Sequence, residues 1–193
     1  MGYESTDERQ CLLISEIKGI AASEYVAENR HNSGAIYSFV EKTAAAMREI
    51  HTLPIGNCSF AQNIDVKLAA ARENIRRGFV DESDFEHENL GRKADDLYDE
   101  LVKTKLSSED LVFTHGDLCL PNFMVINGEI SGFIDFDRGG VADRYQDIAL
   151  FLRSFAFNIE IPVNITEVFC NAYGIDSLDH EKIRYYRLLD ELF

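Results

Sequence analysis

A short run of polar residues in the second half of the chain has the residue types that catalytic sites use. Residues 114–122 read T-H-G-D-L-C-L-P-N, which places Asp117 and Asn122 in the pattern D-x-x-x-x-N, and Asp135 follows thirteen positions after Asn122. Phosphoryl transfer needs a carboxylate near the incoming hydroxyl and hard oxygen ligands for the Mg²⁺ that bridges the nucleotide phosphates. In this interpretation Asp117 orients and deprotonates the hydroxyl, while Asn122 and Asp135 hold Mg²⁺.

A β-hairpin is predicted directly after this run, and it explains how the acids meet. Apolar residues 123–126 and 130–134 flank Asn127-Gly128, the dipeptide preferred in two-residue type I′ turns. The second strand of a hairpin returns to the end where the first begins, so Asp135 is delivered beside Asp117 and Asn122. Together these features are far more specific than the triplet H-G-D, which alone also fits a structural turn.

Neighbouring residues have competing interpretations. His115 is expected to support the loop as a scaffold, and Asp147 to accept hydrogen bonds from it. The D-F-D sequence ending at Asp137 also resembles the aspartyl pair of haloacid-dehalogenase-type phosphatases. That pair normally opens its domain, whereas here it lies in the last third of the chain, so the phosphatase alternative is the weaker one.

Composition limits the partners. The formal net charge is −15, with 19 Lys and Arg against 34 Asp and Glu, which disfavours nucleic acid and anionic membranes. The charge fits either simple solubility or a cationic substrate. The four cysteines are scattered, and no apolar run has the length of a signal peptide or a membrane span. We therefore expect a soluble cytoplasmic protein without a zinc site or disulfide framework.

The remaining pattern predicts an α+β fold that is mostly helical. Residues 10–17 form an apolar run that predicts a buried strand, and residues 81–88 (DESDFEHE) predict an acidic loop. Gly174 is expected to cap one helix at its C-terminus. Helices are predicted over residues 38–51, 64–76, 93–105, 145–155, 165–173 and 180–192.

The segment FTHGDLCLPNFMVINGEISGFIDFDRGGVADRYQDIALFLRS resembles the catalytic segment of aminoglycoside 3′-phosphotransferases. The ending, YYRLLDELF, resembles the C-terminus of that family, and residues 12–16 resemble its hinge strand, so the likeness covers nearly the whole chain. It implies a protein-kinase-like fold and ATP-dependent phosphorylation of the 3′-hydroxyl of antibiotics such as kanamycin or neomycin, which confers resistance.

The resemblance also implies residue roles. Asp117 matches the catalytic aspartate, Asn122 and Asp135 match the Mg²⁺ ligands, and Ser15 and Ile17 fall where the hinge backbone meets adenine. The residues that fall in the antibiotic pocket are Asp84, Glu86, Arg138, Asp190, Glu191 and Phe193.

Charge favours these pocket assignments, because carboxylates make charge-assisted hydrogen bonds to ammonium groups. Each assignment also has a simpler alternative. The acidic loop could be merely solvated, Asp190 and Glu191 could be exposed positions on the last helix, and Arg138 could pair with Asp137 or Asp143.

One departure from the kinase pattern matters. Such enzymes cover the nucleotide phosphates with a glycine-rich loop and a strand lysine, and neither precedes the hinge-like residues here. We therefore divide the chain into residues 1–19, a hinge strand and remnant of an N-terminal lobe, and residues 20–193, a C-terminal lobe. A truncated gene, an isolated lobe or a lobe supplied by another polypeptide would each explain this. The expectation is weak or absent catalysis by this chain alone, and a non-catalytic antibiotic- or nucleotide-binding remnant stays an alternative.

Overall fold

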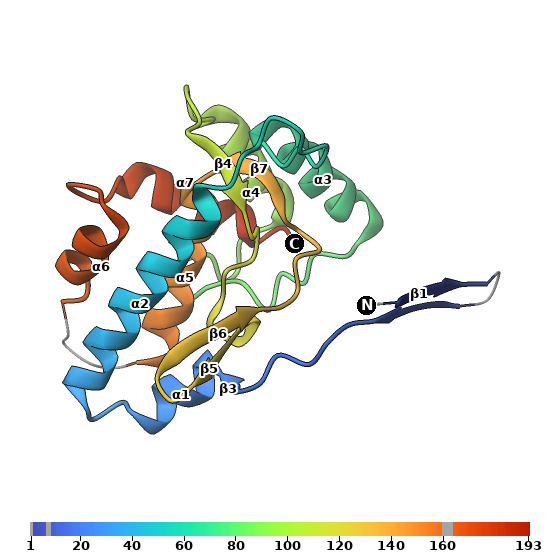
Figure 1. Cartoon of the computed structure of the whole chain (residues 1–193). Coiled ribbons are helices and arrows are strands. Elements are labelled where there is room, and N and C mark those ends of the chain that lie inside the picture. The colour runs from blue at the N-terminus through green and yellow to red at the C-terminus, as the bar shows by residue number, and fades with distance from the viewer. Residues whose placement is uncertain (1, 7–8, 160–163) are drawn as a thin grey trace.

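The structure is a computed structural model that describes residues 2–6, 9–159 and 164–193, and it mixes helices with small sheets (Figure 1). The helices are α1 Ala22–Glu28, α2 Ser33–His51, α3 Ile64–Arg77, α4 Ala94–Lys103, α5 Tyr145–Asn158, α6 Thr166–Tyr173 and α7 His180–Asp190. The strands are β1 Gly2–Ser5, β2 Gln10–Leu13, β3 Ile20–Ala21, β4 Leu111–Thr114, β5 Phe123–Ile126, β6 Glu129–Phe133 and β7 Gly140–Asp143, with a 3₁₀ turn, η1, at Leu120–Asn122. The predicted α+β class is confirmed.

The predicted hairpin is confirmed. Strands β5 and β6 are antiparallel, with Phe123 opposite Phe133 and Ile126 opposite Glu129. Asn127 and Gly128 have φ values of 53° and 77°, the left-handed conformation that a type I′ turn requires at both central positions. Strand β3 extends the hairpin to the order β3-β5-β6. The start of β5 and the end of β6 therefore lie at the same end of this small sheet.

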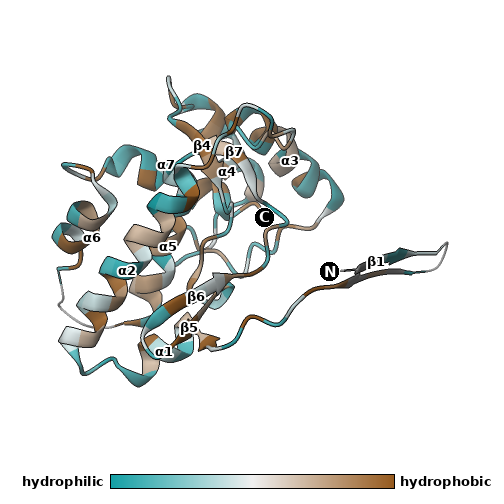
Figure 2. Ribbon diagram, in the orientation of Figure 1, coloured by the Kyte–Doolittle hydropathy of each residue, from teal (hydrophilic) through white to brown (hydrophobic). Residues whose placement is uncertain are grey.

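A column of aromatic rings forms the centre of the core. Phe123 of β5 lies 6.0 Å from Phe39 of α2 and 6.5 Å from Phe151 of α5, between ring centroids. Phe169 of α6 stacks on Phe151 at 5.7 Å and on Tyr173 at 5.6 Å. Figure 2 shows α5 as hydrophobic along most of its length. The hairpin that carries the polar residues is thus fixed to the helices by its own apolar face.

All six predicted helices are present, with different ends. Helix α2 begins five residues earlier than predicted, because Asn32 caps it by accepting a hydrogen bond from the Ala35 N–H at 3.2 Å. Gly174 ends α6 in the left-handed conformation with φ 88°, as expected. The acidic residues 81–88 form turns, which confirms the predicted loop. The sequence analysis did not predict helix α1 or the pairing of β4 with β7. Helix α1 has 7 residues and the two strands have 4 each, which is too short for a clear apolar pattern.

The prediction of a buried strand over residues 10–17 was wrong. Only Gln10–Leu13 is a strand, and it pairs with β1 in a two-stranded ribbon that extends from the body (Figure 1). Leu13 is 72% exposed and Ile14 is 57% exposed. Cys11 is exposed as well, so the apolar character of these residues does not lead to burial. Among the residues that the structure describes, no helix is both long enough and apolar enough to cross a membrane.

Candidate active site

The loop between β4 and β5 holds Asp117 and Asn122 in direct contact. The Nδ2 group of Asn122 donates hydrogen bonds to the Asp117 backbone oxygen at 2.8 Å and to its Oδ2 at 3.0 Å. Asn122 ends the 3₁₀ turn that Pro121 helps to start. This turn brings the two residues close together. Because Asn122 Nδ2 makes both hydrogen bonds, Asn122 Oδ1 is not bonded to Asp117.

Asp135 is brought to the same place by the hairpin. The Ile134 N–H donates to the Asn122 carbonyl oxygen at 2.8 Å, so Asp135 lies one residue beyond a backbone bond to Asn122. Asp135 is exposed and has a φ of 65°, a conformation that residues other than glycine rarely adopt. Such backbone strain is concentrated at functional sites. The backbone therefore brings Asp135 close to Asn122, which itself contacts Asp117, as the sequence predicted.

His115 bridges the loop and the end of the hairpin, which confirms the scaffold role expected for it. Its Nε2 lies 2.8 Å from the Ile134 carbonyl oxygen, and its Nδ1 lies 3.3 Å from the Asp117 N–H. The tautomer with a proton on Nε2 satisfies both contacts, donating to Ile134 and accepting from Asp117. His115 thus fixes the spacing between Asp117 and Asp135.

Asp147 stabilises the loop by accepting hydrogen bonds from its backbone, as predicted. Its Oδ2 accepts from the His115 N–H at 2.7 Å and its Oδ1 from the Gly116 N–H at 2.8 Å. His51 Nε2 lies 3.0 Å from the same Oδ2, and His51 Nδ1 lies 2.6 Å from the Tyr173 hydroxyl. The sequence analysis missed His51, because the contact joins residues 96 positions apart.

Gly116 is required by the close approach of the next turn. Its φ is 89°, and a Cβ there would lie 1.9 Å from the Arg138 carbonyl oxygen. The loop therefore packs against the segment that follows Asp135, and Arg138 is held close to the predicted catalytic residue.

Arg138 begins a chain of ion pairs that joins several predicted pocket residues. Its guanidinium contacts Asp190, and Arg153 Nη2 lies 2.5 Å from Asp190 Oδ2. Arg153 Nη1 also lies 3.7 Å from Glu86 Oε1, and Arg187 contacts the same Glu86 carboxylate. The alternative pairing of Arg138 with Asp137 or Asp143 is wrong. Asp143 instead binds Lys182 at 2.5 Å.

The other predicted pocket residues differ in exposure. Glu191 accepts from the Glu86 N–H at 3.0 Å and from Asn89 Nδ2 at 2.7 Å, and burial raises the pKa of its carboxyl. Asp190 is buried, so the alternative that the last two acids are simply exposed is wrong. Phe193 lies with its ring 4.8 Å from the Arg138 guanidinium carbon, whereas Asp84 is exposed on the loop. We refer to Glu86, Asp190 and Glu191 below as the acidic cluster.

Lys67 is a buried charged residue that the sequence analysis missed. It is 2% exposed, and its ammonium lies 5.4 Å from the centre of the Phe193 ring. Burial, followed by the nearby charge of Arg138, lowers its pKa to about 8. The signal was present in the sequence, because Lys67 shares the apolar stripe of α3 with Ile64, Leu68 and Ala71 at helical spacing.

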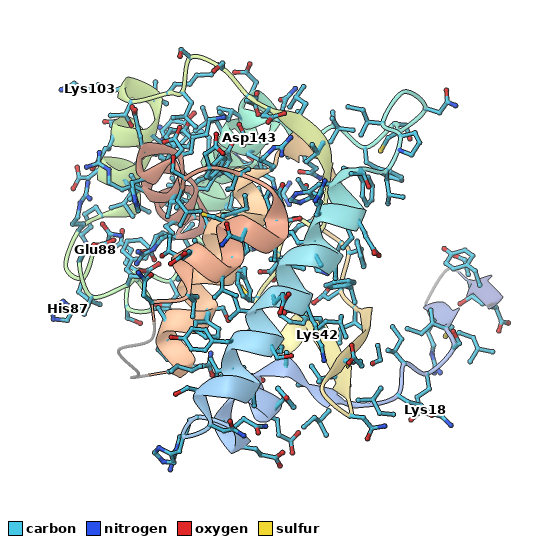
Figure 3. The ribbon with its side chains drawn as sticks, turned by 60° about the vertical axis from the view of Figure 1, so that its left-hand side comes forward. Lys18, Lys42, His87, Glu88, Lys103 and Asp143 are labelled. Carbon is cyan, nitrogen blue, oxygen red and sulfur yellow. The ribbon has the colours of Figure 1, made fainter. Side chains whose placement is uncertain are left out.

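Ser15 and Ile17 lie in the segment between β2 and β3, beside the hairpin. The Ile17 side chain packs on Gly132 of β6, where an added Cβ would lie 3.0 Å from Ile17 Cδ1. The Lys18 carbonyl accepts from the Ser131 hydroxyl at 2.6 Å. In Figure 3, Lys18 marks this N-terminal segment, and His87 and Glu88 of the acidic loop lie on the opposite side of the molecule.

Residues 2–186 match the model of the phosphotransferase enzyme family. An aminoglycoside 3′-phosphotransferase of Niallia circulans is 40% identical over 155 residues, covering 80% of this chain and 58% of the relative. The corresponding protein of Streptomyces fradiae is 36% identical over 192 residues, covering 97% of this chain and 70% of the relative. The chain thus spans only part of the length of these relatives.

Solved structures agree with the fold. The crystal structure of an aminoglycoside-3′-phosphotransferase of type VIII superposes with a TM-score of 0.79 at 32% identity, covering 92% of this chain and 67% of that one. An aminoglycoside phosphotransferase of Streptomyces rimosus, in complex with ADP and streptomycin, gives a TM-score of 0.78 at 28% identity, covering 92% and 68%. With the family model matching most of its residues, the chain belongs to the phosphotransferase enzyme family.

Proposed function

We propose that this chain acts in the ATP-dependent phosphorylation of the 3′-hydroxyl of aminoglycoside antibiotics of the kanamycin or neomycin type, which confers resistance. The observation that carries the proposal is the meeting of Asp117, Asn122 and Asp135 at one end of the β5–β6 hairpin. The names of the relatives, all aminoglycoside 3′-phosphotransferases, support the choice of acceptor. The streptomycin and ADP complex of a structural neighbour supports the choice of both substrates.

Asp117 serves as the acceptor-side base in this proposal. Asn122 donates to Asp117 Oδ2, which fixes the carboxylate and leaves Oδ1 to accept the proton of an incoming hydroxyl. His115 and Asp147 hold the backbone of the same loop, so the carboxylate is preorganised before the acceptor arrives. The chain's own contribution is therefore the orientation of the hydroxyl and the removal of its proton.

Asn122 and Asp135 suit Mg²⁺. Both offer hard oxygen atoms, and the amide orientation of Asn122 leaves its Oδ1 available. Among the described residues no group of three or more His, Cys, Asp or Glu forms a metal cluster, and Mg²⁺ commonly takes only one or two protein ligands with substrate phosphates. When bound, Mg²⁺ supplies the charge that neutralises the nucleotide phosphates.

The two substrates are assigned to different parts of the chain. We propose that Ser15 and Ile17 meet the adenine of ATP, since their segment packs on β6 next to the hairpin that carries Asp135. We propose that Asp84, Arg138, Phe193 and the acidic cluster line the antibiotic pocket. Their carboxylates suit the ammonium groups of the acceptor, because charge-assisted hydrogen bonds are strong.

Binding and turnover should be tested on one sample of the whole chain. Calorimetry with kanamycin, with and without Mg-ATP, is followed by a coupled assay of ADP release. We expect kanamycin to bind and any kanamycin-dependent ADP release to disappear in Asp117→Ala, whereas Asp137→Ala, an exposed carboxylate two residues after Asp135, retains it. Failure of the folded chain to bind kanamycin would refute the proposal.

The same experiment separates the alternatives. Kanamycin binding without any ADP release identifies a binding remnant. A phosphatase of the D-x-D type would instead release phosphate from a phosphomonoester without nucleotide, and Asp135→Asn would abolish that release.

A further inference from the structure

Each carboxylate of the acidic cluster already has a partner within the chain. Asp190 faces Arg138 and Arg153, and Glu191 faces backbone and side-chain N–H groups of residues 86 and 89. Glu86 faces the guanidinium of Arg187. A cationic acceptor that uses these carboxylates must therefore compete with cations of the protein itself.

The pairs differ in how easily they can open. The Asp190 side chain is 7% exposed and binds two arginines, so separating it would leave buried charges unpaired. The Glu86 and Arg187 side chains are 24% and 34% exposed, so both can be rehydrated when they part. The pair of Glu86 and Arg187 is thus the one that a ligand can displace at the smallest cost.

Arg187 also has a second carboxylate within reach. Its Nη2 contacts Glu86 Oε2, its Nε lies 3.4 Å from Glu86 Oε1, and its Nη2 lies 3.7 Å from Oε1 of the more exposed Glu88. A small movement of the guanidinium toward Glu88 would free Glu86 without leaving Arg187 unpaired. The Glu88 side chain, labelled in Figure 3, is 65% exposed.

Glu86 is linked through Arg153 to residues 114–122, the proposed catalytic loop. The Arg153 guanidinium lies 3.7 Å from Glu86 Oε1 and 3.8 Å from the sulfur of Cys119, two residues after Asp117. A cation that takes the place of Arg187 at Glu86 is therefore held on the side of the molecule where the acceptor hydroxyl must meet Asp117.

We propose that Arg187 is a specificity-determining residue, which occupies Glu86 in the free protein in place of an ammonium group of the acceptor and moves away when the acceptor binds. This inference rests on the proposed function. Arg187 lowers the affinity for every acceptor that places a cation at Glu86, and it does not affect acceptors that lack a cation there. The residue thereby reduces the gain in affinity that an acceptor obtains from placing a cation at Glu86.

The test is calorimetry of the whole chain with kanamycin. We expect Arg187→Ala to bind between about 2-fold and about 5-fold more tightly than the wild-type chain, since a partly exposed ion pair contributes at most about that much. Arg187→Lys keeps the charge and should stay near the wild-type affinity. The gain should disappear in the double variant with Glu86→Gln, because the freed carboxylate is then absent.

Arg184→Ala is the matched control, because Arg184 lies three residues earlier on α7 and pairs with Glu100 at 3.6 Å, outside the pocket. It should leave kanamycin affinity unchanged. Far-ultraviolet circular dichroism and the thermal midpoint of every variant show whether the chain is folded.

The outcomes separate this inference from the proposed function. If the wild-type chain binds kanamycin and Arg187→Ala binds it equally or more weakly, the inference is refuted and the proposed function stands. If only Arg187→Ala binds kanamycin, the proposed function fails for the wild-type chain, whereas the competition of Arg187 for Glu86 is supported. If neither folded protein binds kanamycin, both are refuted.

Discussion

The proposed catalytic loop and the acidic cluster lie close together but are held by different kinds of contact. The loop is fixed through its backbone, because the fully buried Asp147 accepts the N–H groups of His115 and Gly116. The acidic cluster is fixed through side chains, mainly by arginines that are partly exposed. The carboxylate proposed as the base is therefore on a rigidly held loop, whereas Glu86 in the acidic cluster can exchange partners.

The magnitudes support this contrast. A buried backbone N–H that loses its acceptor costs about 1–3 kcal/mol, and it has no water to replace that acceptor. An exposed ion pair contributes about 0–1 kcal/mol and is screened by salt. Substitutions in the two regions should therefore differ in their effect on the free energy of unfolding, and the following variants test that difference.

The largest effect is expected for Asp147→Ala. The substitution leaves two buried N–H groups of the catalytic loop and the His51 ring without their acceptor. We expect a loss of about 3 to 5 kcal/mol in the free energy of unfolding, measured by urea denaturation. Asp137→Ala, at an exposed carboxylate, should change it by less than about 0.5 kcal/mol. Equal losses in the two variants would break the contrast.

Lys67→Met should stabilise the protein, with a defined pH dependence. Folding lowers the pKa of Lys67 from 10.5 to about 8, so the charged form opposes folding below pH 8. Between pH 8 and 10.5 the unfolded chain binds the extra proton, so the stability of the wild-type chain rises with pH there. The variant should therefore gain about 2 to 3 kcal/mol near neutral pH and lose most of that gain as the pH rises to 10.5. A gain that does not change with pH would contradict the assignment.

Asn122→Ala should have a smaller effect on stability and a distinct effect on binding. The part-buried amide loses its two bonds to Asp117, which costs about 1 kcal/mol. If Asn122 is a metal ligand, Mg²⁺ should no longer increase the affinity for ATP as it does in the wild-type chain, as measured by calorimetry. An unchanged effect of Mg²⁺ would remove Asn122 from the proposed metal site.

Glu86→Gln should have the smallest effect on stability. Its partners Arg187 and Arg153 are partly exposed and can be hydrated. We expect the free energy of unfolding to change by less than about 1 kcal/mol, and high salt should reduce the difference further. A loss as large as that of Asp147→Ala would show that the acidic cluster is as rigid as the catalytic loop.

The sequence alone was sufficient for the features that depend on neighbouring residues. Asn127-Gly128 determined the hairpin, because few other dipeptides adopt two left-handed conformations in succession. The D-x-x-x-x-N spacing and the strand before Asp135 then determined which polar groups meet. Helical periodicity located most of the helices, although Asn32 began α2 earlier than the apolar pattern did.

Only the tertiary structure decided the features that depend on distant residues. Burial depends on which elements pack together: Cys11 and Leu13 are exposed although they are apolar, whereas Lys67 and Asp190 are buried despite their charge. Arg138 pairs with Asp190, 52 positions away, and not with Asp137 or Asp143, which are nearer in the sequence. His51 likewise contacts Asp147, 96 positions away. Local conformation follows from the steric preferences of adjacent residues, but solvent exposure and charge pairing follow from which elements pack together.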